Sequence, residues 1–130
     1  MKLLFPIFLL IHGLIHSSFL TKAPPAKEGS PVWPFELTNS WLLTPMGMST
    51  DNIKLLGTVL ALIATFGFVL SAAGWIGISF LQPYWVVITV ISCIASILLL
   101  AIFWNNWFVM GPLIDIALLF AIYFKDLAPK

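Results

Sequence analysis

The sequence contains no arginine and very little charge of either sign. Only 8% of its 130 residues are charged, and the formal net charge is +1. Soluble domains carry about 25% charged residues, so a surface of this composition would not stay dissolved in water. The six lysines are scattered and form no basic patch, so we expect no nucleic-acid partner.

Cysteine is almost absent as well. The single Cys93 excludes a disulfide within the chain and a metal site made of several cysteines. The sequence also lacks a glycine-rich phosphate loop and a pair of catalytic carboxylates. These absences favour a non-enzymatic role.

Apolar residues make up 61% of the chain and are grouped into long segments. A helix needs about 20 mostly apolar residues to cross a hydrocarbon core of roughly 30 Å, and a helix satisfies its own backbone groups there. We expect an all-α, integral membrane, antiparallel four-helix transmembrane bundle in one domain, residues 1–130. Its spans are predicted at residues 3–20, 53–74, 84–104 and 107–124.

The first segment has an alternative interpretation as a secretory signal, because a lysine and an apolar run precede small residues. Two histidines interrupt that run, which favours a retained helix.

The long connection over residues 21–52 is predicted to be an interfacial cap on the bundle. Its first part is rich in proline, and its second part, "VWPFELTNSWLLTPMGM", is aromatic but too broken by proline to span. We expect Trp33, Phe35, Glu36 and Trp41 to form the cap. Loops of this length are often functional.

Four spans place both termini on one side of the membrane. The lysines divide equally between the terminal side (Lys2, Lys125, Lys130) and the long-loop side (Lys22, Lys27, Lys54), so the positive-inside rule gives a tie. The acids on the long-loop side favour termini in the cytoplasm. We therefore expect a multi-pass protein of the cell (inner) membrane.

The stretch "LLIHGLIHSSF" carries the most informative polar residues. On a helix, His12, Gly13, His16 and Ser17 share one face. Asp115 is the only acid well inside a predicted span, where such a residue costs about 2.5 to 3.5 kcal/mol.

His12 and Asp115 are predicted to lie at the same depth. Each is ten residues from a terminal-side lysine, Lys2 or Lys125, which corresponds to roughly 15 Å of helix. The first and last helices of an up-down bundle are neighbours. His12, His16 and Asp115 are therefore the candidate ligand or proton site.

Gly111 and Pro112 are predicted to support this site. Pro112 frees a backbone carbonyl one turn before Asp115 and is expected to kink the helix. Gly111 permits close approach, so a small polar cavity beside Asp115 is one expectation.

Three interpretations of the His12, His16 and Asp115 group remain open. The group is a structural clasp that fixes helix register, a pocket or proton path, or a ligand set for a metal, haem or chlorophyll. The cofactor interpretation is not favoured, because a pair of histidines four residues apart on one helix cannot hold a porphyrin from both faces.

Three patches resemble small bacterial four-span membrane proteins that are DoxX-like in layout. They are "HGLIH" in the first span, "PVWPFELTNSWLL" in the long connection and "WNNWFVMGPLID" near the end. The resemblance implies the four-span architecture and supplies no catalytic residues, since the group has no established activity.

The sequence thus predicts a small membrane subunit or binding protein whose polar site a hydrophobic ligand or a partner subunit completes. The alternatives are a proton-coupled transporter acting as an oligomer, and a redox or tetrapyrrole-binding subunit. In each case the expected partners are the lipid bilayer and either further copies of the chain or a larger membrane complex.

Overall fold

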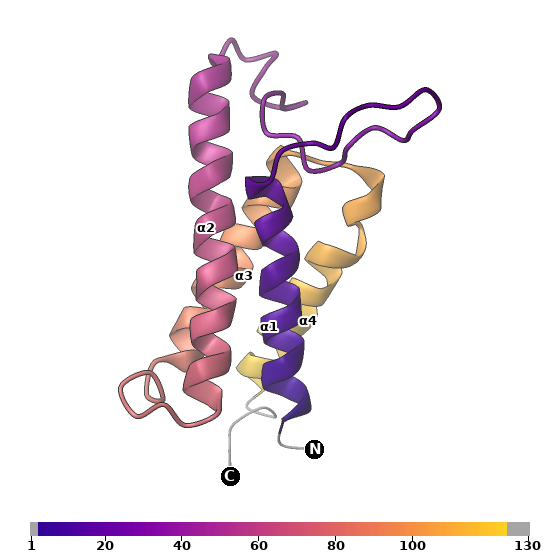
Figure 1. Cartoon of the computed structure of the whole chain (residues 1–130). Helices are drawn as coiled ribbons and strands as arrows, with labels where there is room; N and C mark the ends of the chain where they lie inside the picture. The colour runs from indigo at the N-terminus through magenta and orange to yellow at the C-terminus, as the bar shows by residue number, and fades with distance from the viewer. Residues whose placement is uncertain (1–2, 125–130) are drawn as a thin grey trace.

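The computed structural model describes residues 3–124, and over that range the chain is all-helical with no strand. The prediction of an all-α chain with four helices is confirmed. The elements, shown in Figure 1, are α1 (Leu4–His16), the 3₁₀ helix η1 (Ser17–Leu20), α2 (Thr50–Trp75), α3 (Trp85–Ile102), the 3₁₀ helix η2 (Asn106–Phe108) and α4 (Met110–Tyr123). Lys2, Lys125 and Lys130, on which the predicted orientation partly depends, lie outside the described residues.

Three helical segments are long and apolar enough to cross a membrane: Thr50–Trp75, Trp85–Ile102 and Asn106–Tyr123. The first helical segment, Leu4–Leu20, is apolar but shorter. Its last turn tightens into the 3₁₀ geometry of η1, which is common at helix ends.

Helix α2 begins three residues earlier than predicted. Ser49 has an extended backbone, and its side chain accepts a hydrogen bond from the backbone N–H of Asn52. This is an N-cap, because it satisfies one of the donors that have no partner within the helix.

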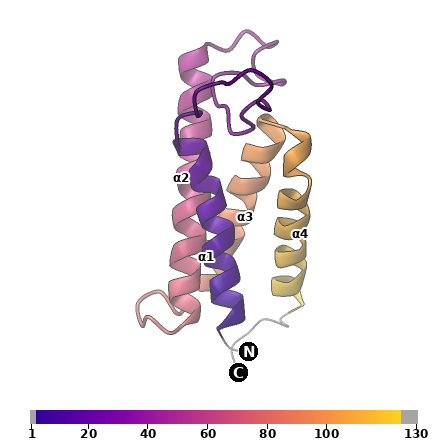
Figure 2. The same ribbon diagram turned by 45° about the vertical axis from the view of Figure 1, so that its right-hand side comes forward.

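The helices pack in chain order. Helix α2 lies against both α1 and α3, and α4 lies against α3, whereas α1 and α4 make hardly any backbone contact. The views in Figures 1 and 2 place the N-terminal end of α1 and the C-terminal end of α4 at the same end of the molecule. The long connection lies at the opposite end.

Helices α1 and α2 approach closely at Gly13. A Cβ atom added there would lie 2.8 Å from the Cβ of Phe68 and 3.1 Å from the carbonyl oxygen of Thr65. A similar close contact joins α2 to α3, where a Cβ atom on Gly67 would overlap the hydroxyl of Ser92. Small residues permit such backbone approach between apolar helices.

Pro112 does not kink the fourth helix, contrary to the prediction. Helix α4 begins at Met110, after η2, so Pro112 lies in its first turn. Backbone N–H groups in the first turn have no partner within the helix, and a proline there removes no hydrogen bond.

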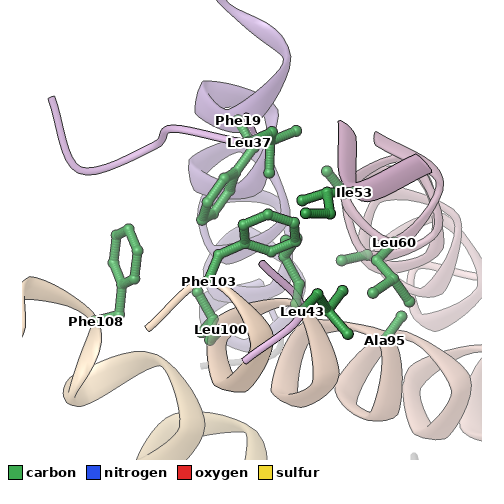
Figure 3. Packing of buried hydrophobic residues seen from close by; sticks show 12 residues of the cluster. Phe19, Leu37, Leu43, Ile53, Leu60, Ala95, Leu100, Phe103 and Phe108 are labelled. Carbon is green, nitrogen blue, oxygen red and sulfur yellow. The ribbon is translucent and has the colours of Figure 1, made fainter. Parts of the chain in front are cut away.

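The long connection folds back onto the end of α3. The hydroxyl of Ser40 donates to the carbonyl of Ile102 at 2.6 Å, and the indole N–H of Trp41 donates to the carbonyl of Ala101 at 2.7 Å. These carbonyls end a helix and lack partners within it. Leu37 and Leu43 of the same connection enter the hydrophobic core, as Figure 3 shows.

The outer faces of the helices are apolar. Large hydrophobic side chains are exposed along every helix, among them Ile7, Ile11, Leu14, Leu55, Phe66, Val87, Ile91, Leu113, Ile116 and Phe120. Water-soluble monomers rarely expose apolar surface on this scale.

Candidate polar site in the helix core

Four side chains form one continuous chain of hydrogen bonds in the core, which we call the core network. His12 Nε2 lies 2.9 Å from Asp115 Oδ1, Asp115 Oδ2 lies 2.5 Å from Ser96 Oγ, and Ser96 Oγ lies 2.6 Å from His16 Nε2. All four residues are at most 4% exposed. Both carboxylate oxygens of Asp115 therefore have hydrogen-bond partners although the side chain is shielded from solvent.

The core network links three helices. His12 and His16 lie on α1, Ser96 on α3 and Asp115 on α4. His12 and Asp115 meet, as their matched depths predicted, although the backbones of α1 and α4 hardly touch. Their side chains thus bridge the two helices.

The ring of His16 has a defined tautomer. Its Nδ1 lies 2.9 Å from the backbone carbonyl oxygen of His12. A carbonyl oxygen only accepts hydrogen bonds, so Nδ1 carries a hydrogen.

With His12 Nε2 donating to Asp115 Oδ1, counting hydrogens leaves two arrangements of the bonds that join His16, Ser96 and Asp115. If His16 is neutral, its Nε2 must accept the single hydroxyl hydrogen of Ser96. Asp115 must then be protonated and donate to Ser96. If His16 is an imidazolium, Nε2 donates to Ser96, and Ser96 donates to an ionised Asp115. The two arrangements contain the same number of protons and differ by the shift of two of them.

Aromatic rings enclose the two histidines. The ring of Phe68 meets His12 edge-on at a centroid distance of 4.8 Å and lies 5.9 Å from His16. Phe8 stacks on His12 at 5.9 Å. These contacts restrict the ring orientations on which the hydrogen bonds depend.

A cavity of about 180 Å³ adjoins the core network between α1 and α4, and we call it the core cavity. The two histidines line it, and the rest of its lining is almost wholly apolar: Ile15, Phe19, Phe35, Leu100, Trp107, Phe108, Met110, Gly111 and Ile114. The core cavity therefore suits an apolar group.

The predicted supporting residues have different environments. Gly111 lines the core cavity, and a Cβ atom there would lie 2.4 Å from Leu100 Cδ1. Gly13 lies at the contact with α2. Ser17 is not part of the core network, because its hydroxyl donates to the carbonyl of Leu14 in its own helix at 2.6 Å.

The four predicted cap residues also make contacts with different parts of the protein. Phe35 packs on Phe19 and Phe108 at centroid distances of 5.1 and 5.4 Å, at the rim of the core cavity. Trp33 packs on Phe35 at 5.1 Å. Trp41 instead pairs with the end of α3.

Glu36 hydrogen-bonds within the connection. Its Oε1 accepts from the hydroxyl and the backbone N–H of Thr38 at 2.7 and 3.0 Å. These bonds hold the pKa of Glu36 below its ordinary value.

Ser96 is the member of the core network that the sequence did not single out. It is one of three hydroxyl residues on α3, with Thr89 and Ser92. The signal that could have found it is a count of hydrogen-bond partners, since a buried carboxylate has two oxygens to satisfy.

The described residues show no group of three or more His, Cys, Asp or Glu arranged to hold a metal ion. His12, His16 and Asp115 lie together, but both ring nitrogens of His16 and both oxygens of Asp115 are engaged in hydrogen bonds. A tetrapyrrole does not fit either, because ordinary ligand pockets start near 300 Å³ and the core cavity is smaller.

Comparisons of the chain with models of protein families, with curated proteins and with solved structures found no match. The resemblance to DoxX-like proteins therefore stays a prediction.

Proposed function

We propose that the chain is an integral membrane protein whose four helices form an antiparallel transmembrane bundle. Three long apolar segments and the exposed apolar side chains support this. The fourth span is Leu4–Leu20, whose length lies near the lower limit of about 17 residues for a spanning helix. The proposed location is the bacterial inner membrane with cytoplasmic termini, in keeping with the DoxX-like layout.

Within this bundle, we propose that the protein is a small binding protein or subunit that takes an apolar group into the core cavity. The single observation that carries this is the core cavity itself, which lies between two helices joined only by side chains. Its volume suits a segment of a hydrocarbon chain or one apolar side chain of a partner subunit. The core network holds α1 and α4 at the separation that keeps the cavity open.

Substitution of Ile114 by phenylalanine tests the binding role, because Ile114 lines the core cavity and the larger ring would fill it. The matched control is Leu113→Phe on the same helix, where Leu113 is exposed on the outer face. The protein is purified from its native membrane, and its organic extract is compared with bulk lipid by mass spectrometry. A compound enriched with the wild type and Leu113→Phe but lost with Ile114→Phe supports the proposal. Equal extracts from all three contradict it, provided that co-purifying protein subunits are also unchanged.

A proton-coupled transporter, acting as an oligomer, is the second candidate. It is favoured by the continuous chain of hydrogen bonds and its two proton arrangements. Asp115→Asn separates this function from binding. The amide can accept from His12 and donate to Ser96, so it preserves the arrangement with neutral Asp115 but cannot exchange a proton.

The transporter proposal predicts that Asp115→Asn abolishes proton flux in proteoliposomes while the melting temperature stays within a few degrees of the wild type. Unchanged flux, or no flux in the wild type under an imposed pH gradient, would rule it out.

A further inference from the structure

A second cavity, of about 440 Å³, lies beside the C-terminal end of η1 and the first turns of α2, and we call it the headgroup cavity. Its volume falls within the ordinary range of roughly 300 to 1,000 Å³ for ligand pockets. Unlike the core cavity, it is lined by charged, hydroxyl and indole groups together with apolar rings: Phe19, Leu20, Thr21, Lys22, Ala23, Trp33, Phe35, Glu36, Leu37, Thr38, Lys54 and Thr58.

The lining of this cavity contains two lysines, Lys22 and Lys54, and one acid, Glu36. Within the described residues, neither Lys22 nor Lys54 has a carboxylate oxygen at salt-bridge distance. Glu36 is engaged with Thr38, and Lys54 acts on it only through longer-range attraction. The lining thus carries a net charge of +1, which a single anionic group would neutralise.

Trp33 supplies an unused donor. Its indole N–H is buried and has no hydrogen-bond partner among residues 3–124. Leaving such a donor unsatisfied is costly, and Trp33 lines the headgroup cavity. A ligand whose acceptor oxygen reaches this N–H would therefore gain a hydrogen bond in addition to the contacts with the two lysines.

The position along α2 places the cavity at the level of lipid headgroups. A helix of 26 residues is about 39 Å long, which exceeds the hydrocarbon core of roughly 30 Å. Lys54 lies in the first two turns of α2, at the end nearest the long connection. Its ammonium group therefore reaches the headgroup layer on that side.

An apolar wall separates the headgroup cavity from the core cavity. Phe19 and Phe35 line both cavities and meet edge-on. The two cavities are therefore separate, and a ligand can occupy the headgroup cavity without entering the core cavity.

We propose that the headgroup cavity binds the phosphate of an amphipathic lipid, with Lys22 and Lys54 neutralising it and the Trp33 indole donating to an oxygen. A free phosphate ion has the same chemistry, and the experiment distinguishes the two sources. The inference rests on the proposed membrane insertion, but it does not require that the core cavity be occupied.

Retention of phosphatidylglycerol tests the inference. The protein is reconstituted in nanodiscs of phosphatidylcholine with a minor fraction of phosphatidylglycerol, and bound lipids are counted by native mass spectrometry. Lys22→Gln and Lys54→Gln should each lower retention of phosphatidylglycerol about fivefold, and high salt should lower it further. Trp33→Phe keeps an aromatic ring, although a smaller one, and removes the N–H donor, so it should weaken retention too.

Lys27→Gln is the matched control, since it removes the same charge from the same connection but does not line the cavity. Unchanged retention in Lys22→Gln and Lys54→Gln, or an equal loss in Lys27→Gln, would overturn the inference. If the protein shows no preference for phosphatidylglycerol over phosphatidylcholine, and inorganic phosphate at millimolar concentration displaces the bound lipid, the cavity is a site for free phosphate. Ile114→Phe should leave the retention of phosphatidylglycerol unchanged. The proposal for the core cavity and the proposal for the headgroup cavity can therefore fail independently.

Discussion

At the scale of single residues, the core network is defined by the His16 ring, whose Nδ1 must donate to the carbonyl of His12. That one constraint links the donors of the remaining pairs, so the direction of the His16–Ser96 bond sets the direction of the Ser96–Asp115 bond. Asp115 is consequently held either as a neutral acid beside a neutral His16, or as a carboxylate beside an imidazolium. Both states satisfy every bond, which is what allows an acid to lie at 0% exposure between apolar helices.

Ser96→Ala should destabilise the protein by about 1 to 3 kcal/mol, because it leaves His16 Nε2 and Asp115 Oδ2 buried without a partner. Equilibrium unfolding in mixed micelles measures this. Ser92→Ala is the control, since the Ser92 hydroxyl donates to a carbonyl of its own helix. Equal losses in the two variants would show that Ser96 has no special role.

Glu36 gives a prediction on pH. Its pKa is lowered in the folded protein, so it adds stability above the pKa of the unfolded chain and loses it as pH falls through the folded pKa. Thr38→Val removes the hydroxyl donor and should raise the pKa of Glu36 towards its ordinary value. Titration of the side-chain carboxyl by NMR measures this. Thr21→Val, whose hydroxyl donates to the carbonyl of Ser18, should cause no change; a rise with both variants would contradict the assignment.

The sequence was sufficient to predict the meeting of His12 and Asp115, because position along a helix follows from residue count and the first and last helices were expected to be neighbours. It was not sufficient to predict Ser96. Three hydroxyls occur on one face of α3 within two turns, namely Thr89, Ser92 and Ser96, and the position of α3 along its axis relative to α4 decides which of them reaches Asp115. That axial position depends on the packing of α3 against its neighbours.

At the scale of the helices, the pattern of apolar segments predicts where each helix lies but not its exact ends. Helix α2 extends back to its Ser49 cap, and α4 begins only after the 3₁₀ turn at Asn106–Phe108. Local hydrogen bonds decide both ends, whereas hydropathy varies too slowly along the chain to show them. The predicted kink at Pro112 was wrong because α4 begins at Met110, so Pro112 lies in the first turn and not inside the helix.

The contact between α1 and α2 depends on Gly13. Gly13→Ala should destabilise the protein by roughly 1 to 3 kcal/mol, because the added methyl group must displace Phe68 or the backbone at Thr65. Thermal unfolding in detergent measures the loss. Leu14→Ala is the comparison, since Leu14 is half exposed on the outer face. A smaller effect of Gly13→Ala than of Leu14→Ala would contradict the close packing.

At the scale of the whole molecule, an apolar exterior surrounds a hydrophobic core in which one polar network is buried. Charged and histidine side chains at mid-helix lie in the core network, while large apolar side chains cover the outside. The polar side chains of the long connection gather at one end of the molecule. Ser40 and Trp41 donate to the last carbonyls of α3, and Glu36 and Thr38 line the headgroup cavity.

The proposed bundle predicts the sidedness of its connections. In a variant with Cys93→Ser, single cysteines at Leu3 and Phe80 should react with a membrane-impermeant maleimide from one side, and a cysteine at Lys27 from the other. All three positions are exposed. Labelling of Leu3 and Lys27 from the same side would show that α1 does not span the membrane.

The most direct test of the account is the distance between His12 Nε2 and the carboxyl group of Asp115 in the protein reconstituted in lipid bilayers, measured by solid-state NMR with labelled histidine and aspartate. We predict a nitrogen–oxygen separation near 2.9 Å, and a loss of the dipolar contact in Asp115→Leu. A wild-type spectrum without that contact would contradict the core network and, with it, the cavity that the network holds open.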